Sequence, residues 1–345
     1  MAIKSSKKTD DNTKERVISP KESELDTLNE VKLRPKLLVD YIGQDSIKKH
    51  LDIAIKSANI RGEPLEHILL YGPPGLGKTT LSLIISNEMG VNLKHTSGPA
   101  IEKQADIISI LTGISEGDIL FIDEIHRLKP QIEEILYGAM EDYTIDIMVG
   151  SGTGATSIKM DIPKFTLVGA TTKLSSLSSP LRDRFGNIFK LDFYNRDELG
   201  KIVRRSLNIL GCEIKNNEVG DIVAKKSRGT PRIVNRFVKI VRDYQTVGHD
   251  VESISGIEKI FDGLGIDSLG LDYLDRKILE TLNSFGLKPI GLNTLSSIVG
   301  EEEDTIEDVI EPFLLKIGFI ERTGRGRVIT DAGKSHIETT VYNFK

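Results

Sequence analysis

Gly72–Thr80, with the sequence GPPGLGKTT, decides the fold of this chain. It fits the pattern G-x-x-x-x-G-K-[ST], a loop that binds the phosphates of a nucleotide through backbone N–H groups. Gly75 and Gly77 allow the backbone to turn inward and approach the anion closely. Lys78 places a positive charge at the outer phosphates, and the Thr79 hydroxyl can ligate Mg²⁺. The stretch therefore predicts a site for a nucleoside triphosphate.

The residues around this loop supply the expected context. His67–Tyr71 (HILLY) is an apolar run typical of a buried strand, and Thr80–Ile85 (TLSLII) is typical of a helix. A helix that begins near Lys78 would direct the positive end of its dipole at the anion. A chance glycine-rich turn is the alternative, and this context disfavours it.

Composition narrows the class of protein. The length of 345 residues suggests two or three domains. A net charge of −5 argues against general affinity for nucleic acid, so any contact with DNA must come from a local patch. The single cysteine, Cys212, excludes an internal disulfide and fits a reducing cytoplasm. We expect no membrane span, because no apolar run approaches ~20 residues and the N-terminus has no signal core.

The order of patterns predicts an α/β fold followed by two smaller domains. Residues 1–24 are polar and charged, which favours a disordered tail. Residues 25–194 alternate helical patterns with short apolar runs, which indicates a parallel sheet wrapped by helices. The apolar runs are Ile68–Tyr71, Ile119–Asp123 and Phe165–Ala170. Residues 195–266 are helical, as in Arg196–Leu210 and Pro231–Val247, and predict a small all-α domain.

Residues 267–345 predict a winged helix-turn-helix. Helical patterns cover Leu271–Phe285, Leu292–Val299 and Thr305–Ile317. Phe319–Glu321 and Arg327–Thr330 then flank a Gly-Arg-Gly turn, which predicts a hairpin. A generic helical cap is the alternative.

Two acids follow the strand Ile119–Asp123, at the sheet edge where the metal of a bound nucleotide must be held. Asp123 suits the shell of Mg²⁺, usually through water, and Glu124 can polarise the attacking water. A solvated strand end is the alternative, which an intact phosphate loop disfavours. Thr171 and Thr172 end the next strand, where a hydroxyl could orient water or sense the γ-phosphate; a plain strand-end turn is equally consistent with either threonine.

Two arginines have a pattern that suits phosphate. Ser178–Gly186 (SSPLRDRFG) predicts a short helix, and we favour Arg184 on it as a charge supplied to the nucleotide of a neighbouring subunit. Its alternative is a surface ion pair with Asp183. Thr230 and Pro231 predict a helix start, so Arg232 on the first turn could reach a nucleotide across a cleft. An exposed arginine is the alternative there.

Together these strings resemble the AAA+ ATPases and, within them, the RuvB family of bacterial Holliday-junction branch-migration motors. The resemblance runs from about Leu25 to about Thr339. Besides the phosphate loop it includes Leu33–Pro35 (LRP), Tyr41–Gln44 (YIGQ), Ile119–Leu128 (ILFIDEIHRL), Ala139–Tyr143 (AMEDY), Phe165–Thr172 (FTLVGATT), Ser179–Gly186 (SPLRDRFG), Gly229–Arg232 (GTPR) and Thr305–Pro312 (TIEDVIEP).

The resemblance implies an activity and partners. It implies an AAA+ core with an α-helical lid and a winged-helix domain, hydrolysing ATP to ADP and phosphate with Mg²⁺. It also implies a homo-hexameric ring on double-stranded DNA at Holliday junctions, recruited by RuvA, with a RuvC-type resolvase in a larger complex. Recombination, repair and the SOS response to DNA damage are the implied setting.

The resemblance also implies roles for individual residues. Thr79 and Asp123 serve Mg²⁺, Glu124 is the catalytic acid, and Arg184 acts on the neighbour's ATP. The implied nucleotide contacts are Leu33, Arg34, Tyr41, Ile42, Gly75, Leu76, Gly77, Lys78, Thr79, Thr80, Glu141, Asp142, Tyr143, Tyr194 and Arg232.

Residues 143–162 predict a long β-hairpin with one apolar face, because apolar residues alternate with polar ones. In the family this hairpin docks on RuvA, which makes Ile147 and Met160 candidate partner contacts. An ordinary hairpin packed on its own core is the alternative. The turn Ser151–Gly154 (SGTG) departs from the Pro-Ala element that the family more often has there.

The predicted wing concentrates positive charge in an otherwise acidic domain. Glu301–Glu311 holds seven acids and no base, so its helix is a poor candidate for the major groove. Arg322, Arg325 and Arg327 surround the two glycines of the turn, which suits sequence-independent contact with DNA phosphates. A solvated turn is the alternative.

Two other functions remain open from the sequence. An initiator or clamp-loader ATPase would share the core, although the AMEDY hairpin and the wing argue against it. A nucleotide-switched DNA-binding regulator would turn over little ATP, and the presence of Glu124 and Arg184 argues against it.

Overall fold

A computed structural model describes residues 32–149, 156–212, 214–286 and 288–341. The predicted tail over residues 1–24 and the hairpin turn Ser151–Gly154 lie outside the described residues. None of the helices in these ranges combines the length and apolar character needed to cross a bilayer.

The first domain is built on a five-stranded parallel sheet with the order β2-β3-β6-β1-β7. The strands are β1 (Ile68–Tyr71), β2 (Leu93–Ser97), β3 (Ile119–Asp123), β6 (Thr166–Thr171) and β7 (Asn187–Lys190). The central strands β1, β3 and β6 are the predicted apolar runs, with β6 shifted by one residue. The edge strands β2 and β7 were not predicted, because they are only half-buried and carry polar residues.

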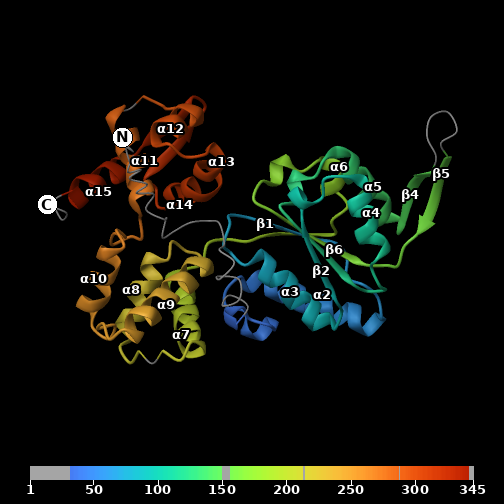
Figure 1. The fold of residues 1–345 in the computed structure, drawn as a ribbon, viewed down its shortest axis with the longest axis horizontal. Helices are drawn as coiled ribbons and strands as arrows, with labels where there is room; N and C mark the ends of the chain where they lie inside the picture. The colour runs from blue at the N-terminus through green and yellow to red at the C-terminus, as the bar shows by residue number, and fades with distance from the viewer. Residues whose placement is uncertain (1–31, 150–155, 213, 287, 342–345) are drawn as a thin grey trace, which may run out of the picture.

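Helices cover both faces of this sheet (Figure 1). One face packs on α2 (Asp45–Arg61) and α3 (Lys78–Met89), and the other on α4 (Gln104–Thr112), α5 (Pro130–Glu141) and α6 (Ser179–Arg182). Along β1, Ile68 and Leu70 face the first layer while Leu69 faces the second, as the period of two in a strand requires. The predicted parallel sheet wrapped by helices is confirmed.

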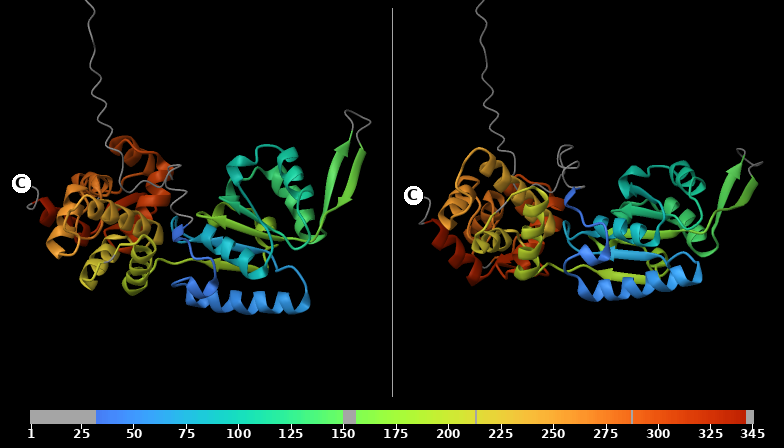
Figure 2. Two further views of the ribbon diagram at one scale, coloured as in Figure 1. Left: turned by 60° about the horizontal axis from the view of Figure 1, so that its bottom comes forward. Right: turned by 90° about the horizontal axis from the view of Figure 1, so that it is seen from below.

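A β-hairpin stands out from this domain at the end farthest from the rest of the chain (Figure 2). It consists of β4 (Thr144–Val149) and β5 (Thr156–Asp161). Ile145 lies opposite Met160, and Ile147 lies opposite Ile158, so these side chains share one face as predicted. Ile145 is buried against α5, whereas Ile158 is 52% exposed. The apolar face of the hairpin is therefore covered by α5 near the sheet and exposed toward the turn.

The second domain is a helical lid of α7 (Arg196–Ile209), α8 (Asn217–Lys226), α9 (Pro231–Thr246) and α10 (Ile254–Gly263). Its core is continuous with the α2–α3 face of the sheet, through Tyr41 and Tyr194. The lid and the α2–α3 face of the sheet therefore share one apolar core.

The third domain has a separate core and a winged-helix arrangement. It contains α11 (Tyr273–Ser284), α12 (Leu292–Val299), α13 (Glu303–Thr305), the π-helical turn η6 (Ile306–Ile310), α14 (Glu311–Lys316), β8 (Ile320–Thr323), β9 (Gly326–Ile329) and α15 (Asp331–Val341). The single helix predicted over Thr305–Ile317 is interrupted by η6, and α15 was not predicted. The predicted three helices and hairpin are otherwise confirmed.

Candidate nucleotide-binding site

The phosphate loop connects the C-terminal end of β1 to the N-terminus of α3. Gly72, Gly75 and Gly77 have φ values of 143°, 81° and 100°, which other residues rarely adopt. A Cβ on Gly72 would lie 2.5 Å from the carbonyl oxygen of Leu191, so the position excludes any side chain. The loop is thus held against the chain that follows β7, with its backbone N–H groups and the α3 N-terminus at one place.

Lys78 is buried at the bottom of this loop, with 7% exposure. Its Nζ donates to the carbonyl oxygens of Gly72 (2.7 Å) and Pro73 (3.0 Å). Burial lowers the pKa of Lys78 to about 8, although the nearby carboxylates Asp123 and Glu124 oppose the shift. The site therefore carries a desolvated cation that gains from a multiply charged anion.

A cleft opens over the loop between the sheet and the lid. It brings together several predicted residues that are far apart in the sequence: Arg34, Gly75, Gly77, Lys78, Thr79, Thr80, Asp123, Glu124 and Arg232. Arg232 is fixed there by its backbone N–H, which donates to the Gly75 oxygen (3.3 Å). Pro231 and Asn235 of α9 complete the wall, so the lid contributes directly to the cleft.

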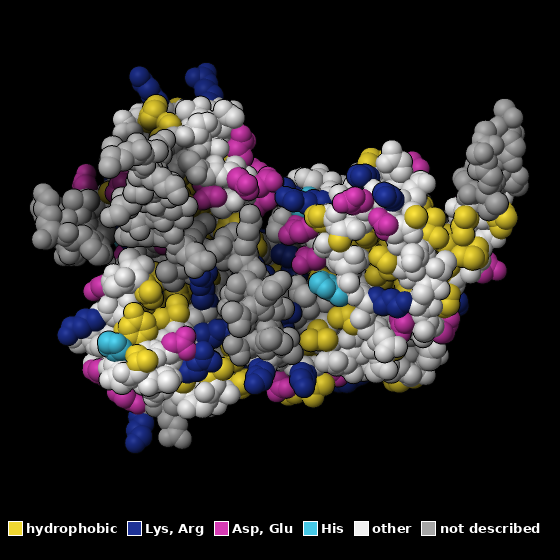
Figure 3. Space-filling model, viewed as in Figure 1, with side chains coloured by type: hydrophobic (Ala, Val, Ile, Leu, Met, Phe, Trp, Pro, Cys, Tyr) yellow, Lys and Arg dark blue, Asp and Glu magenta, His cyan; other side chains and the backbone are white. Residues whose placement is uncertain are grey.

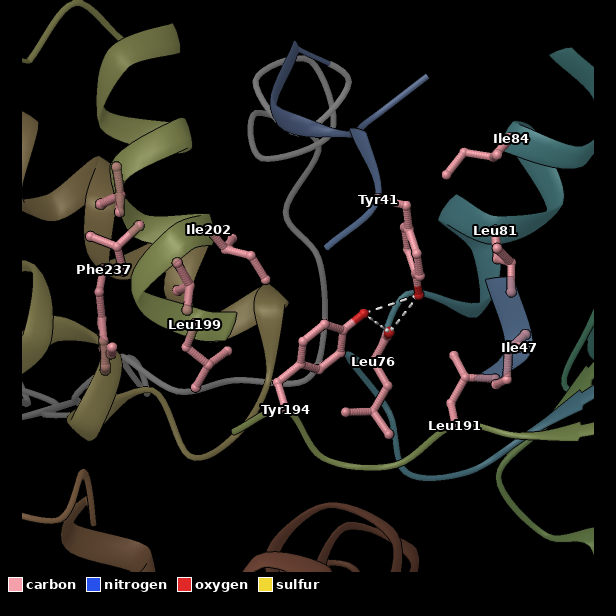
Figure 4. Packing of buried hydrophobic residues seen from close by; sticks show 14 of the residues in the cluster. Tyr41, Ile47, Leu76, Leu81, Ile84, Leu191, Tyr194, Leu199, Ile202 and Phe237 are labelled. Carbon is pink, nitrogen blue, oxygen red and sulfur yellow. Dashed lines mark hydrogen bonds between the residues drawn. The ribbon is translucent and has the colours of Figure 1, made fainter. Parts of the chain in front are cut away.

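An adjoining hollow continues the cleft away from the phosphate loop. Leu33, Arg34, Tyr41, Ile42 and Tyr194 line it. Figure 4 shows the two tyrosines meeting at the Leu76 carbonyl, with Tyr194 Oη 3.0 Å from Tyr41 Oη and 3.3 Å from the Leu76 oxygen. Burial raises the pKa of Tyr194 to about 12 and raises that of Tyr41 well above its usual value, so both stay neutral donors. An apolar wall with a few fixed polar groups is the usual lining for a base and sugar.

Glu124 lies at the inner edge of the cleft, just after β3. Its Oε2 accepts a hydrogen bond from Thr172 Oγ1 (3.3 Å) and lies 3.3 Å from His126 Nδ1. Burial, followed by the charge of Asp123, raises the pKa of Glu124. A carboxylate with a raised pKa beside a phosphate loop is suited to accept a proton from water.

His126 is a site residue that sequence reasoning missed. Its Nδ1 lies 2.9 Å from Thr171 Oγ1, and burial followed by Arg127 and Lys173 lowers its pKa to about 4. The ring is therefore neutral at neutral pH and joins Thr171 to the Glu124 carboxylate. Its position two residues after Glu124 was the available signal.

The two threonines have different partners. Thr171 is fully buried and bonds to His126, whereas Thr172 donates to Glu124. Of the two, Thr172 has the direct contact with the candidate base.

Arg184 lies at the opposite end of the sheet from the phosphate loop. It precedes β7, whose first residue Asn187 pairs with Ile68, the first residue of β1. The loop follows Tyr71, the last residue of β1, so a strand length of roughly 10 Å separates the two ends. Arg184 therefore cannot serve the phosphates bound by its own chain.

The guanidinium of Arg184 is held by groups of α5 and α6. Nη2 donates to Glu141 Oε2 (2.9 Å), Nη1 donates to the Pro180 oxygen (2.7 Å), and the group lies 4.6 Å from the Tyr137 ring centre. Its Nε is buried and has no hydrogen-bond partner within the described ranges. The alternative reading, a surface ion pair between Arg184 and Asp183, is not observed, because Asp183 pairs with Arg182 at 3.9 Å.

This geometry corrects the placement of Glu141, Asp142 and Tyr143. None of the three lines the cleft of this chain. Glu141 pairs with Arg184, and Tyr143 packs against Phe165 with ring centres 6.2 Å apart. Asp142 lies 3.9 Å from Lys159 Nζ, so of the three only Glu141 contacts Arg184.

The wing arginines have partners that the sequence did not reveal. Arg322 and Arg327 do not stand free at the hairpin tip, because both donate to the carboxylate of Glu311, which is fully buried. Arg322 Nε lies 2.8 Å and Arg327 Nη2 lies 3.3 Å from Glu311 Oε2. Arg325 is the exposed arginine of the turn, and its side chain has no ion pair with another described residue. The sequence did not reveal this pairing, because Glu311 is the first residue of α14 and only the fold brings it next to the wing.

Three family models cover almost the whole described chain. Residues 33–191 match the Holliday junction DNA helicase RuvB P-loop domain, 194–261 the RuvB AAA lid domain, and 268–338 the RuvB C-terminal winged helix domain. The chain belongs to the RuvB family. It is therefore a P-loop ATPase of the AAA+ class, with the predicted core, lid and winged-helix domains.

Individual relatives agree with this assignment. The Holliday junction branch migration complex subunit RuvB of Dehalococcoides mccartyi (strain CBDB1) is 52% identical over 334 residues, which are 96% of this chain and 95% of that protein. The solved structure of the Thermotoga maritima RuvB Holliday junction branch migration motor has a TM-score of 0.82 and 47% identity, covering 89% of this chain and 98% of that one.

Proposed function

We propose that this RuvB-family chain is an ATP-driven DNA motor that migrates the branch point of Holliday junctions. The observation that carries the proposal is the division of the site between the two ends of one sheet. A complete hydrolytic centre then requires two chains in head-to-tail contact, and repetition of such a contact closes a ring. We propose a hexamer on duplex DNA.

The residues of the cleft have separable tasks. Lys78 and the loop N–H groups bind the triphosphate, Arg232 reports its presence to the lid, and Tyr41 and Tyr194 hold the wall of the base pocket. Glu124 removes a proton from the attacking water, and His126 lies beside its carboxylate. Arg184 of a neighbouring chain stabilises the charge that develops as phosphate leaves and ADP forms.

The cleft also fits Mg²⁺. No cluster of three or more His, Cys, Asp or Glu side chains suited to a metal occurs in the described ranges. Magnesium at a nucleotide needs only one or two protein oxygens, since phosphates and water complete its shell. Thr79 and Asp123 both line the cleft and would hold the ion, which neutralises phosphate charge when bound.

Contacts with DNA and protein partners complete the proposal. Arg325 at the wing tip contacts duplex phosphates without reading sequence. The open part of the hairpin face, with Ile147 and Met160 half-buried and Ile158 exposed, docks on a RuvA-type protein. A RuvC-type resolvase, a role in recombination, repair and the SOS response, and a cytoplasmic setting belong to the same proposal.

Junction migration tests this function directly. We expect ATP-dependent movement of a synthetic four-way junction by the chain with added RuvA, and ring-sized particles with ATP and duplex. Ile147→Asp or Met160→Asp should weaken RuvA-dependent migration and leave basal ATP hydrolysis intact. A well-folded chain that binds DNA but neither migrates junctions nor turns over ATP would instead be a nucleotide-switched regulator.

A further inference from the structure

An acidic surface of the winged-helix domain lies against the loops that follow β3 and β6. We name Asp304, Glu307 and Asp308 the acidic clamp. Figure 3 shows acidic side chains at the edge of the winged-helix domain, facing basic side chains of the ATPase core. The contact is between two regions 131 residues apart in the chain, since Lys173 Nζ donates to Asp304 Oδ1.

Lys173 is the centre of this contact. Its Nζ lies 3.2 Å from Asp304, 3.3 Å from Glu307 and 3.2 Å from Asp308. Arg127 adds a fourth ion pair, at 3.1 Å from Asp304. Burial alone would lower the pKa of Lys173, but the hydrogen bonds from the clamp outweigh it and raise the pKa. One cation shared by three carboxylates is a network and not an isolated surface pair.

The same lysine is joined to the groups around the candidate base. Its backbone N–H donates to Thr171 Oγ1 (3.0 Å), and that hydroxyl lies 2.9 Å from His126. The preceding residue, Thr172, donates to Glu124. Arg127 lies three residues after Glu124 on the turn η3 (Ile125–Arg127). The acidic clamp therefore forms ion pairs with both loops beside Glu124, the one after β3 and the one after β6.

The clamp is joined to the wing on its other side. Glu307 uses Oε2 for Lys173, while its Oε1 lies 3.4 Å from Arg322 and 3.6 Å from Arg327. The two arginines also hold the buried Glu311. A continuous chain of charged contacts thus runs from the wing to the loop that carries Thr172.

We propose that Lys173 is a positioning residue through which the winged-helix domain controls Glu124. This inference rests on the proposed function. With the clamp closed, Thr172 engages the Glu124 carboxylate and limits its use as a base. When duplex DNA binds the wing at Arg325, Glu307 moves away from Lys173. The loop that carries Lys173 and Thr172 then shifts, and Thr172 releases the Glu124 carboxylate. DNA binding and ATP hydrolysis are then coupled within one chain.

ATP turnover with and without duplex tests the coupling. We expect Glu307→Gln with Asp308→Asn to raise the DNA-free rate about threefold or more, within the usual range for coupled sites. The DNA-bound rate should stay near that of the unmodified chain, so stimulation by DNA falls by the same factor. Glu302→Gln is the matched control, because this exposed acid precedes the clamp and contacts neither Lys173 nor Arg127.

A charge exchange separates coupling from loss of structure. Asp308→Lys should uncouple turnover from DNA. Adding Lys173→Glu should restore part of the DNA stimulation, because the pair forms again with reversed signs while Asp304 and Glu307 repel the new carboxylate. Unchanged turnover and stimulation in the clamp variants, with an unmodified chain that DNA stimulates, would overturn the inference alone. An unmodified chain without DNA-stimulated turnover would overturn the proposed function with it.

Zero-length cross-linking detects the contact between Lys173 and the acidic clamp directly. A carbodiimide should join Lys173 to a clamp carboxylate, because the atoms already lie within 3.3 Å. Mass spectrometry of the digested protein should find this link in the DNA-free chain and find less of it with duplex and ATP. Equal yield in both states would contradict release of the clamp.

Discussion

In the proposed function, the two ends of the central sheet carry opposite halves of a hydrolytic site. At the C-terminal ends of the strands, Lys78 and Glu124 line a cleft with Arg232 of the lid. At the N-terminal ends, Arg184 is paired with Glu141 and stacked on Tyr137. The first end thus has the phosphate loop and the proposed base, and the second has the arginine that we propose for the phosphates of a neighbouring chain.

The difference shows how one fold makes catalysis depend on assembly. A head-to-tail neighbour brings the Arg184 end of one sheet to the cleft of the next. Arg184 must then exchange Glu141 for phosphate, which is the stronger partner because it carries more charge. Its buried, unsatisfied Nε favours that exchange.

The largest expected effect comes from removing the finger. Arg184→Ala should lower ATP turnover by about 10³-fold or more, the usual contribution of an arginine supplied to a phosphoryl transfer. Nucleotide binding to the isolated chain should not change, because Arg184 lies away from the cleft. Steady-state hydrolysis and a fluorescent-nucleotide titration measure the two effects.

Arg182→Ala is the matched control for that variant. Arg182 is the last residue of α6, two positions before Arg184, and it pairs with Asp183 near the surface. Its removal should change turnover little, and an equal loss in both variants would assign the effect to α6 itself.

Replacing Glu124, the proposed base at the other end of the sheet, should have the next largest effect. Glu124→Gln should reduce hydrolysis on the order of 10³-fold, because an amide cannot accept the proton of the attacking water. ATP should still bind, and a ring should still assemble. Rapid-quench measurement of a single turnover checks this, and near-normal chemistry in the variant would exclude Glu124 as the base.

Proton linkage at Lys78 gives a smaller, graded effect. Its pKa is about 8 in the folded chain, against 10.5 for an ordinary lysine. The empty site therefore loses its charge as the pH rises through 8, and ATP affinity should fall roughly tenfold per pH unit above that value. The unfolded chain keeps the proton up to 10.5, so the same shift adds stability to the fold as the pH rises from 8 to 10.5.

Lys78→Arg provides the control for this pH dependence. A guanidinium stays charged over the whole range, so the variant's affinity should be weaker but flat between pH 7 and 9. Isothermal titration at several pH values distinguishes the cases, and the same slope in both proteins would assign the proton to another group.

The smallest effect is expected at Glu141. Glu141→Gln keeps a hydrogen-bond acceptor for Arg184 but removes its charge, so turnover should change by about threefold or less. A loss as large as that of Arg184→Ala would mean that Glu141 has a direct role in hydrolysis.

The sequence predicted local features better than contacts between side chains that are far apart in the chain. The phosphate loop, the strands β1, β3 and β6, and the acids Asp123 and Glu124 were found because each has a local pattern of glycine, apolar or charged residues. The edge strands β2 and β7 have no such pattern. His126 was missed because its role comes from Thr171, which the fold brings to it from 45 residues away.

The wing gives the clearest case of a hidden partner. Three arginines around two glycines predicted a phosphate-binding tip, yet Arg322 and Arg327 neutralise the buried Glu311. Truncating both arginines would leave that carboxylate unpaired inside the domain, which commonly costs about 3–5 kcal/mol. Single residue types reveal charge, but only the fold shows which charges are already satisfied.

Mixing two inactive variants is the most direct test of the shared site. Arg184→Ala supplies an intact cleft and Glu124→Gln supplies an intact finger, so roughly a quarter of the contacts in a randomly mixed ring regain both. We predict that equimolar mixing restores ATP turnover far above the sum of the separate rates. A mixture that gives only this sum would contradict a hydrolytic site built by two chains.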